Sequence, residues 1–153
     1  MSVEGIDEVS FGAKDLAACQ RFFADWGLAQ VSASAQALVC ESLNGCRVIA
    51  AASDTPGLPP GIEPDPTLRE VVWGVQTQAD LDAIREKFRS QPGFVDGGER
   101  VGCTDPNGLA VRVQVSRKRP VSLTTAKTNT WTDRVRVNQP APAYDRATPV
   151  EVG

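Results

Sequence analysis

The N-terminal residues change from an alternating to a helical pattern of apolar positions. Alternation up to Gly12 predicts a strand with Val9 and Phe11 on its apolar side. Asp15 is suited to the N-cap of a following helix, and Gly27 to its C-terminal stop. The apolar stripe between them consists of Leu16, Cys19, Phe23 and Trp26. The pattern therefore predicts a strand followed by a helix.

The same pattern returns 62 residues later. Residues 8–12 (Glu-Val-Ser-Phe-Gly) match residues 70–74 (Glu-Val-Val-Trp-Gly), and each copy leads through Asp-Leu into a helical pattern. In the second copy Thr77 and Asp80 resemble a capping box, and Pro92-Gly93 ends the helical pattern. The second apolar stripe consists of Leu81, Ile84 and Phe88. The repeat predicts two similar structural units.

Short strand-like runs follow each helix. We expect strands at about 28–33, 36–43 and 46–52 in the first unit, and at about 94–96, 99–104 and 109–115 in the second. Asn44-Gly45 predicts a two-residue hairpin loop that places Leu43 opposite Cys46. A turn is expected at 105–108, and a loop with five prolines separates the units. The order βαβββ, given twice, predicts an α+β fold.

Alternation also assigns side chains of the repeated strands to two faces. The bulky aromatic side is expected to pack on the helices, with Trp73 in the core. The opposite face carries both repeated glutamates and the polar side of the last strand. We expect this face to be lined by Glu8, Ser10, Glu70, Val72, Arg112 and Gln114.

The composition excludes several kinds of site. The 153 residues, about one domain in length, include no histidine, which removes His-ligated metals and the Ser-His-Asp and Cys-His pairs. A net charge of −3 argues against nucleic-acid binding. No apolar run reaches the roughly 18 residues of a membrane span, and the N-terminus lacks the pattern of a signal peptide. We expect a cytoplasmic protein without membrane contact.

The four cysteines are expected to be reduced and mostly buried. None forms a C-x-x-C pair, and disulfides are rare in the cytoplasm. Because no histidine is available to generate a thiolate, we assign no cysteine a catalytic role. For the same lack of a base, Ser10 is not proposed as a nucleophile.

Charge and composition change near residue 115. Residues 1–115 carry a net charge of −7, whereas residues 116–153 carry +4, four prolines and few apolar residues. We therefore expect a folded body over 1–115, with units at about 3–55 and 66–115, and an extended linker or arm over 116–153. Within this arm, residues 120–149 are expected to be mobile or held only by a partner.

Short segments spread along the body carry a family motif. They are residues 6–9 (Ile-Asp-Glu-Val), 14–16 (Lys-Asp-Leu), 22–23 (Phe-Phe), 26–28 (Trp-Gly-Leu) and 105–109 (Asp-Pro-Asn-Gly-Leu). Together they resemble the vicinal oxygen chelate superfamily, which includes glyoxalase I, bleomycin-resistance proteins and extradiol catechol dioxygenases. The resemblance covers about residues 3–115. It implies that two tandem βαβββ units form one curved, cup-shaped mixed sheet, with the helices on its outer face and a metal usually inside.

The chain departs from this family where the metal should bind. Metal-binding members place histidine where Glu8 stands, often histidine again at Glu70, and glutamate where Arg112 stands. One interpretation is an oxygen-only site built on the two glutamates for a hard cation. The other is a charge-compensated cluster in which Arg112 pairs with one or both glutamates. A guanidinium cannot ligate a metal. We favour the cluster, because two carboxylates with a cation beside them already satisfy each other, and we assign no catalytic or metal-binding residue.

The resemblance leads to hypotheses from different functional classes. Extradiol dioxygenases resemble two such modules in tandem, of which the N-terminal one has generally lost its ligands. The first hypothesis is that this chain is such a non-catalytic N-terminal module, with Fe(II) expected only in a downstream module. The second is a stand-alone small-molecule binding protein similar to bleomycin-resistance proteins, and a glyoxalase-type lyase or isomerase comes third. A reading frame that continues past Gly153 into a histidine-containing unit would favour the first.

These hypotheses also define the expected partners. The ligand would be a small, aromatic molecule, and no cofactor is expected within this chain. A second copy of the chain or a second module is expected as a packing partner, whereas nucleic acid and membrane are not.

Overall fold

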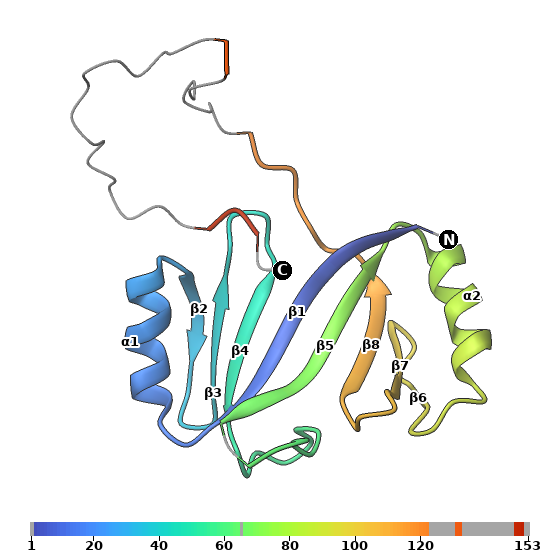
Figure 1. Ribbon diagram of the computed structural model, residues 1–153, viewed down its shortest axis with the longest axis horizontal. Coiled ribbons are helices and arrows are strands. Elements are labelled where there is room, and N and C mark those ends of the chain that lie inside the picture. The colour runs from blue at the N-terminus through green and yellow to red at the C-terminus, as the bar shows by residue number, and fades with distance from the viewer. Residues whose placement is uncertain (1, 65, 123–130, 133–148, 152–153) are drawn as a thin grey trace.

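A computed structural model describes residues 2–64, 66–122, 131–132 and 149–151. Within them one eight-stranded curved sheet has the strand order β2-β3-β4-β1-β5-β8-β7-β6 (Figure 1). The strands are β1 (Val3–Ala13), β2 (Ala29–Ala33), β3 (Ala37–Glu41), β4 (Arg47–Ala52), β5 (Thr67–Val75), β6 (Val95–Asp96), β7 (Arg100–Thr104) and β8 (Ala110–Val115), and the helices are α1 (Leu16–Trp26) and α2 (Gln78–Phe88). The predicted α+β fold with two βαβββ units is confirmed.

Both helices begin at the predicted caps. Asp15 accepts a hydrogen bond from Ala18 N at 2.8 Å, and Gly27 ends α1 with φ at 93°. Thr77 caps α2 by accepting a hydrogen bond from Asp80 N at 3.2 Å. Each helix has 11 residues, and no helix in the described part of the chain is long and apolar enough to cross a membrane.

Each helix covers the strands of its own unit. α1 packs on β2, β3 and β4, and α2 on β5, β7 and β8, so that the helices lie at opposite flanks of the sheet in Figure 1. Val9 and Phe11 pack on the first core as predicted. The first core is built around Phe23, Leu28, Leu38, Cys40 and Val48, and the second around Val75, Leu81, Ile84, Val101 and Val113.

The two units join through the antiparallel pair of β1 and β5. β1 also pairs in parallel with β4, and β5 with β8, so the two repeated strands form the centre of the sheet. The β1–β5 register shifts between Ile6 and Glu8. This shift inserts Asp7 as an extra residue, and Asp7 and Glu8 are both buried, at 5% and 6% exposure.

Two tryptophans are exposed, although the pattern assigns Trp73 to the apolar side of a strand and Trp26 to the apolar stripe of a helix. Trp73 is 37% exposed and Trp26 is 55% exposed, so the predicted core position of Trp73 is wrong. Alternation assigns a residue to a face but does not show how far the helix on that face extends. Trp73 lies on a central strand, whereas the helices cover the flanks (Figure 1). Trp26 instead stacks on Phe22, with ring centroids 6.5 Å apart.

The β3–β4 loop is one residue longer than predicted. Ser42 N donates to Cys46 O at 3.0 Å, so Ser42 rather than Leu43 lies opposite Cys46. Asn44 Oδ1 accepts hydrogen bonds from Ser42 Oγ at 2.8 Å and Cys46 N at 3.1 Å. These side-chain bonds favour the wider loop, which Gly45 closes at φ 89°.

All four cysteines are free thiols. Cys40, Cys46 and Cys103 are buried and Cys19 is half-buried, in agreement with the prediction of reduced, mostly buried thiols. Burial raises the pKa of the Cys40 and Cys103 thiols, which keeps both protonated at neutral pH.

The chain stays attached to the body beyond residue 115. Residues 116–119, here called the strap, run from the end of β8 to the β3–β4 turn. Ser116 N donates to Val75 O and Arg119 N donates to Asn44 O, both at 2.8 Å. The strap therefore connects the second unit back to the first.

A second tail segment contacts the same turn. Pro149 O and Val150 O accept hydrogen bonds from Leu43 N and Asn44 N, at 2.9 Å and 3.0 Å. The expectation of a mobile arm over 120–149 falls mostly on residues outside the described part of the chain.

Candidate functional site

The predicted floor of the cup is a continuous patch across the three central strands. Glu8 on β1 and Arg112 on β8 both lie beside Val72 of β5. Glu70 lies two residues earlier on β5, beside Ser10 of β1. Strand pairing therefore brings the two glutamates and the arginine together from positions far apart in the sequence.

Each glutamate of the floor has its own arginine. Arg112 Nε lies 3.2 Å from Glu70 Oε2. Glu8 is held instead by Arg100 of β7, whose two terminal nitrogens lie 3.0 Å and 3.2 Å from the two carboxylate oxygens. The floor is thus two separate ion pairs rather than one arginine shared between two glutamates.

Arg100 is a site residue that the sequence reasoning missed. It pairs in register with Gln114 of β8, and its Nε donates to Gln114 Oε1 at 2.7 Å. The predicted turn at 105–108 could have identified Arg100. If the two strands that flank this turn are paired residue by residue away from it, Arg100 comes to lie beside Gln114.

The floor is largely shielded from water. The side chains of Glu8 and Glu70 are 7% and 15% exposed, and Arg112 is 18% exposed. Burial raises the pKa of the Glu70 carboxyl, although the charges of Arg112 and Arg100 act in the opposite direction. The desolvation of Glu70 is therefore only partly offset by its arginine partner.

Gly102 of β7 makes room for the Arg112 side chain. A Cβ at Gly102 would lie 2.3 Å from Arg112 Cδ and 2.4 Å from Val111 O. The arginine also donates to Cys103 O at 3.2 Å. Only glycine allows Arg112 to lie flat against β7 in this way.

These residues do not fit a divalent metal. Both oxygens of Glu8 are already bound by Arg100, and the third position holds a guanidinium, which repels cations. Among the described residues, no group of three His, Cys, Asp or Glu side chains could hold a metal ion. The donor set instead forms a neutralised polar floor.

Two of the cavities in the described part of the chain are lined by a floor glutamate. The larger, of about 370 Å³, lies between the proline-rich loop, β6 and the floor, and is lined by Gly57, Pro59, Glu70, Val95, Asp96, Gly97, Arg100 and Arg112. The smaller, of about 110 Å³, contains Glu8 and Gln114. The other two predicted cup-lining residues, Ser10 and Val72, are buried and line neither of these cavities.

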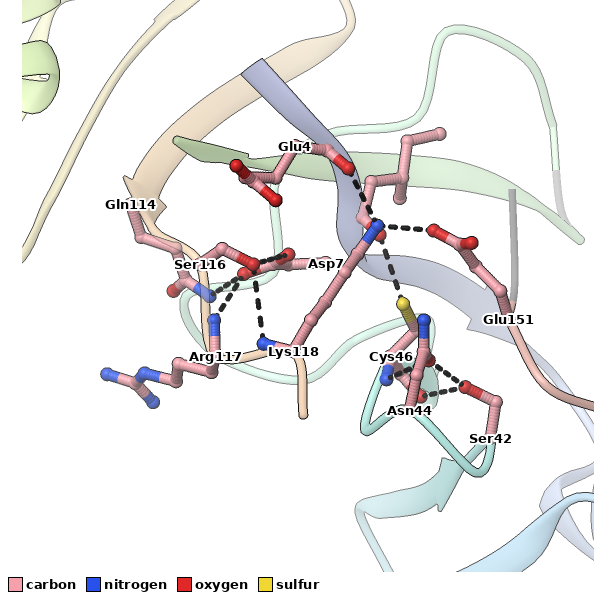
Figure 2. A network of polar contacts seen from close by, with 11 residues as sticks. Glu4, Asp7, Ser42, Asn44, Cys46, Gln114, Ser116, Arg117, Lys118 and Glu151 are labelled. Carbon is pink, nitrogen blue, oxygen red and sulfur yellow. Dashed lines mark hydrogen bonds and ion pairs between the residues drawn. The ribbon is translucent and has the colours of Figure 1, made fainter. Parts of the chain in front are cut away.

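Asp7 organises a second polar network, shown in Figure 2. Its carboxylate accepts hydrogen bonds from Gln114 Nε2 and Ser116 Oγ, both at 2.9 Å, and from Arg117 N at 3.1 Å. Strict alternation places Asp7 on the face opposite Glu8. The register shift after Ile6 interrupts this alternation, so that the side chains of Asp7 and Glu8 both contact polar groups. The carboxylate thereby fixes the start of the strap.

Comparison with models of known protein families and with curated proteins found no match. Solved structures do match. They include the Mn(II)-bound glyoxalase from Novosphingobium aromaticivorans, with a TM-score of 0.55, 22% identity and 79% coverage of this chain. A catechol 2,3-dioxygenase matches with a TM-score of 0.57, 15% identity and 76% coverage.

A variant of homoprotocatechuate 2,3-dioxygenase from Brevibacterium fuscum is also similar, with a TM-score of 0.57, 16% identity and 78% coverage of this chain. The chain spans only 43%, 42% and 34% of the lengths of these three proteins, respectively. At such identities the likeness shows the fold and not the activity. The chain therefore has the vicinal oxygen chelate fold. This follows from its two paired βαβββ units around an open cup and from its similarity to these solved structures.

Proposed function

We propose that this chain is a non-catalytic module of vicinal oxygen chelate type, serving as the N-terminal part of a ring-cleaving dioxygenase-type protein. Its role would be to supply a packing surface and part of a substrate funnel, while the metal chemistry resides in another module. The chain's partial coverage of the similar dioxygenases supports this proposal.

The observation that carries the proposal is the pair of salt bridges on the cup floor. The sequence resemblance implies that Glu8 and Glu70 stand where metal-binding members carry ligands, and each glutamate here is paired with an arginine. A metal would have to displace both arginines and leave their guanidinium groups beside a cation, which is electrostatically unfavourable.

Metal analysis tests this proposal. The chain, purified without chelator and then exposed anaerobically to Fe(II) or Mn(II), should retain well below one equivalent of either metal. The double variant Glu8→Ala, Glu70→Ala should match it, as should the control Glu86→Ala on the exposed surface of α2. One equivalent of metal that is lost in the double variant and kept in the control would refute the proposal.

A second candidate function is small-molecule binding by the chain itself. The 370 Å³ cavity falls within the usual size of ligand pockets and combines Pro59 and Val95 with the charged floor. Titration with catechol, followed by amide NMR shifts, should then perturb Val95 and Arg112. Arg112→Ala should weaken the response, whereas Arg89→Ala on α2 should leave it unchanged. Absence of any shift at millimolar catechol would exclude this candidate for catechols.

A further inference from the structure

The smaller cavity beside the strap is unusually rich in arginine. It has a volume of about 110 Å³ and is lined by four arginines and three carboxylates. The arginines are Arg47 of β4, Arg100 of β7, and Arg117 and Arg119 of the strap. Arg100 is committed to Glu8 and to Gln114, so the other three determine what the cavity can bind.

One carboxylate is shared by two of these arginines. Glu41 Oε1 lies 2.9 Å from Arg47 Nε, and Glu41 Oε2 lies 3.1 Å from Arg119 Nη2. Burial acts to raise the pKa of Glu41, but hydrogen bonds and charges from the two arginines outweigh it and lower the pKa. One negative charge thus faces two positive charges.

The remaining charges do not cancel this excess within the cavity. Arg117 pairs with Glu99 at 3.0 Å, but Glu99 is 85% exposed and lies outside the cavity lining, where a salt bridge contributes little. Asp7 is buried and already accepts three hydrogen bonds. Within the described part of the chain, Arg47 uses its Nε and Arg119 its Nε and Nη2, so both keep guanidinium N–H groups for a further acceptor.

The strap holds the main chain of Arg117 and Arg119 in place before any ligand arrives. Asp7 fixes Ser116 and Arg117 N, and Arg119 is anchored at its main chain by Asn44 O and at its side chain by Leu43 O, 3.2 Å from Nε. Such preorganisation lowers the ordering cost of binding.

We propose that Arg47, Arg119 and Arg117 form a binding site for a small oxyanion, the carboxylate or phosphate group of a small molecule. Guanidinium groups match the oxygens of both anions through charge-assisted, bidentate hydrogen bonds. The 110 Å³ volume admits such a head group, given roughly 30 Å³ per water molecule in the liquid, but no aromatic ring together with it.

Titration of the full chain with inorganic phosphate and with acetate tests the site, with sodium chloride at matched ionic strength as the reference. Amide NMR shifts should saturate at Gly45, Arg47 and Arg119 with at least one of the two anions and not with chloride. The anion that saturates at lower concentration identifies the head group.

Three variants and one control test the contributions of Arg47, Arg119 and Glu41 to the site. Arg47→Ala and Arg119→Ala should each weaken binding by about tenfold or more, and the second retains the main-chain bond to Asn44 O. Glu41→Gln should tighten binding, because it removes the internal anion that competes for both guanidinium groups. Arg89→Ala, an exposed arginine of α2, should leave the affinity unchanged.

Two outcomes would overturn the proposal. One is the absence of saturable shifts in both the unaltered chain and Glu41→Gln. The other is binding that responds to Arg89→Ala as strongly as to Arg47→Ala, which would indicate general attraction of anions to the surface. Neither outcome bears on the metal analysis of the cup floor, because no floor glutamate is altered.

Discussion

Single side chains determine the electrostatics of the cup floor, because each glutamate there has its own arginine. Removal of Arg112 leaves the Glu70 carboxylate, whose side chain is 15% exposed, without its ion-pair partner. The cost should lie between the roughly 0–1 kcal/mol of an exposed pair and the roughly 3–5 kcal/mol of a buried one. Glu70→Gln in the Arg112→Ala background should recover part of this loss, whereas Glu8→Gln should not, because Glu8 belongs to Arg100.

A mutant cycle from urea unfolding at two pH values measures this coupling. Without Arg112, the pKa of Glu70 should rise further. The native state then binds protons more readily than the unfolded state, so the deficit is largest at high pH and shrinks as the pH falls. Equal coupling of Arg112 to both glutamates would contradict two separate ion pairs and show that Arg112 is shared between Glu8 and Glu70.

The carboxyls of Glu41 and Glu70 should titrate on opposite sides of the usual pKa of a glutamate. Burial raises the pKa of Glu70, so the charged carboxylate destabilises the folded protein at neutral pH. This cost is relieved as the pH falls through the raised pKa. Burial acts to raise the pKa of Glu41, but its two arginines outweigh burial and lower it. The Glu41 carboxylate therefore stabilises the folded protein above its unfolded pKa, and this stabilisation is lost as the pH falls through the lowered folded pKa. NMR titration of the carboxyl carbons should therefore give a lower pKa for Glu41 than for Glu70. The reverse order would contradict both assignments.

Gly74 is required by the approach of Asp7. A Cβ at this position would lie 2.4 Å from Asp7 Oδ1 and 2.8 Å from Ser116 Cβ. Gly74→Ala should therefore destabilise the protein by roughly 1–3 kcal/mol, as overpacking commonly does. Gly97→Ala is the matched control, because its Cβ would meet only Arg100 O, at 3.5 Å. Comparable urea midpoints for the two variants would show that Asp7 can move at little cost.

At the scale of elements, the sequence repeat was sufficient to predict both units, because helix caps and alternation are local signals. The helices have Asp15 and Thr77 as their N-caps, as predicted. Alternation also placed Glu8, Glu70 and Arg112 on one face.

The misses arise where the local period is interrupted or where coverage is tertiary. The register shift after Ile6 brought Asp7 into a polar network that strict alternation does not contain. Side-chain bonds of Asn44 widened the hairpin loop. The exposure of Trp73 depends on where the helices end over the sheet, and no local pattern gives that distance.

At the scale of the whole molecule, the strap adds a connection between units that also meet through the central strands and the Arg100–Glu8 ion pair. A chain that ends at Val115 would leave Asp7 without two of its three donors, the Ser116 hydroxyl and Arg117 N. A buried polar group without partners costs roughly 1–3 kcal/mol. We expect a chain ending at residue 115 to unfold at lower urea concentration than one ending at residue 122. Equal midpoints would show that the strap is dispensable.

The sequence separation of the Asp7 contacts also has a consequence for the order of folding. Its hydrogen bonds span 107 to 110 residues, so they close one of the longest loops in the chain, at a high entropic cost. They can form only after both units and their shared central strands are in place. Asp7→Ala should consequently accelerate unfolding while leaving the refolding rate nearly unchanged. In a stopped-flow chevron plot, the unfolding limb should move to higher rates and the folding limb should stay in place.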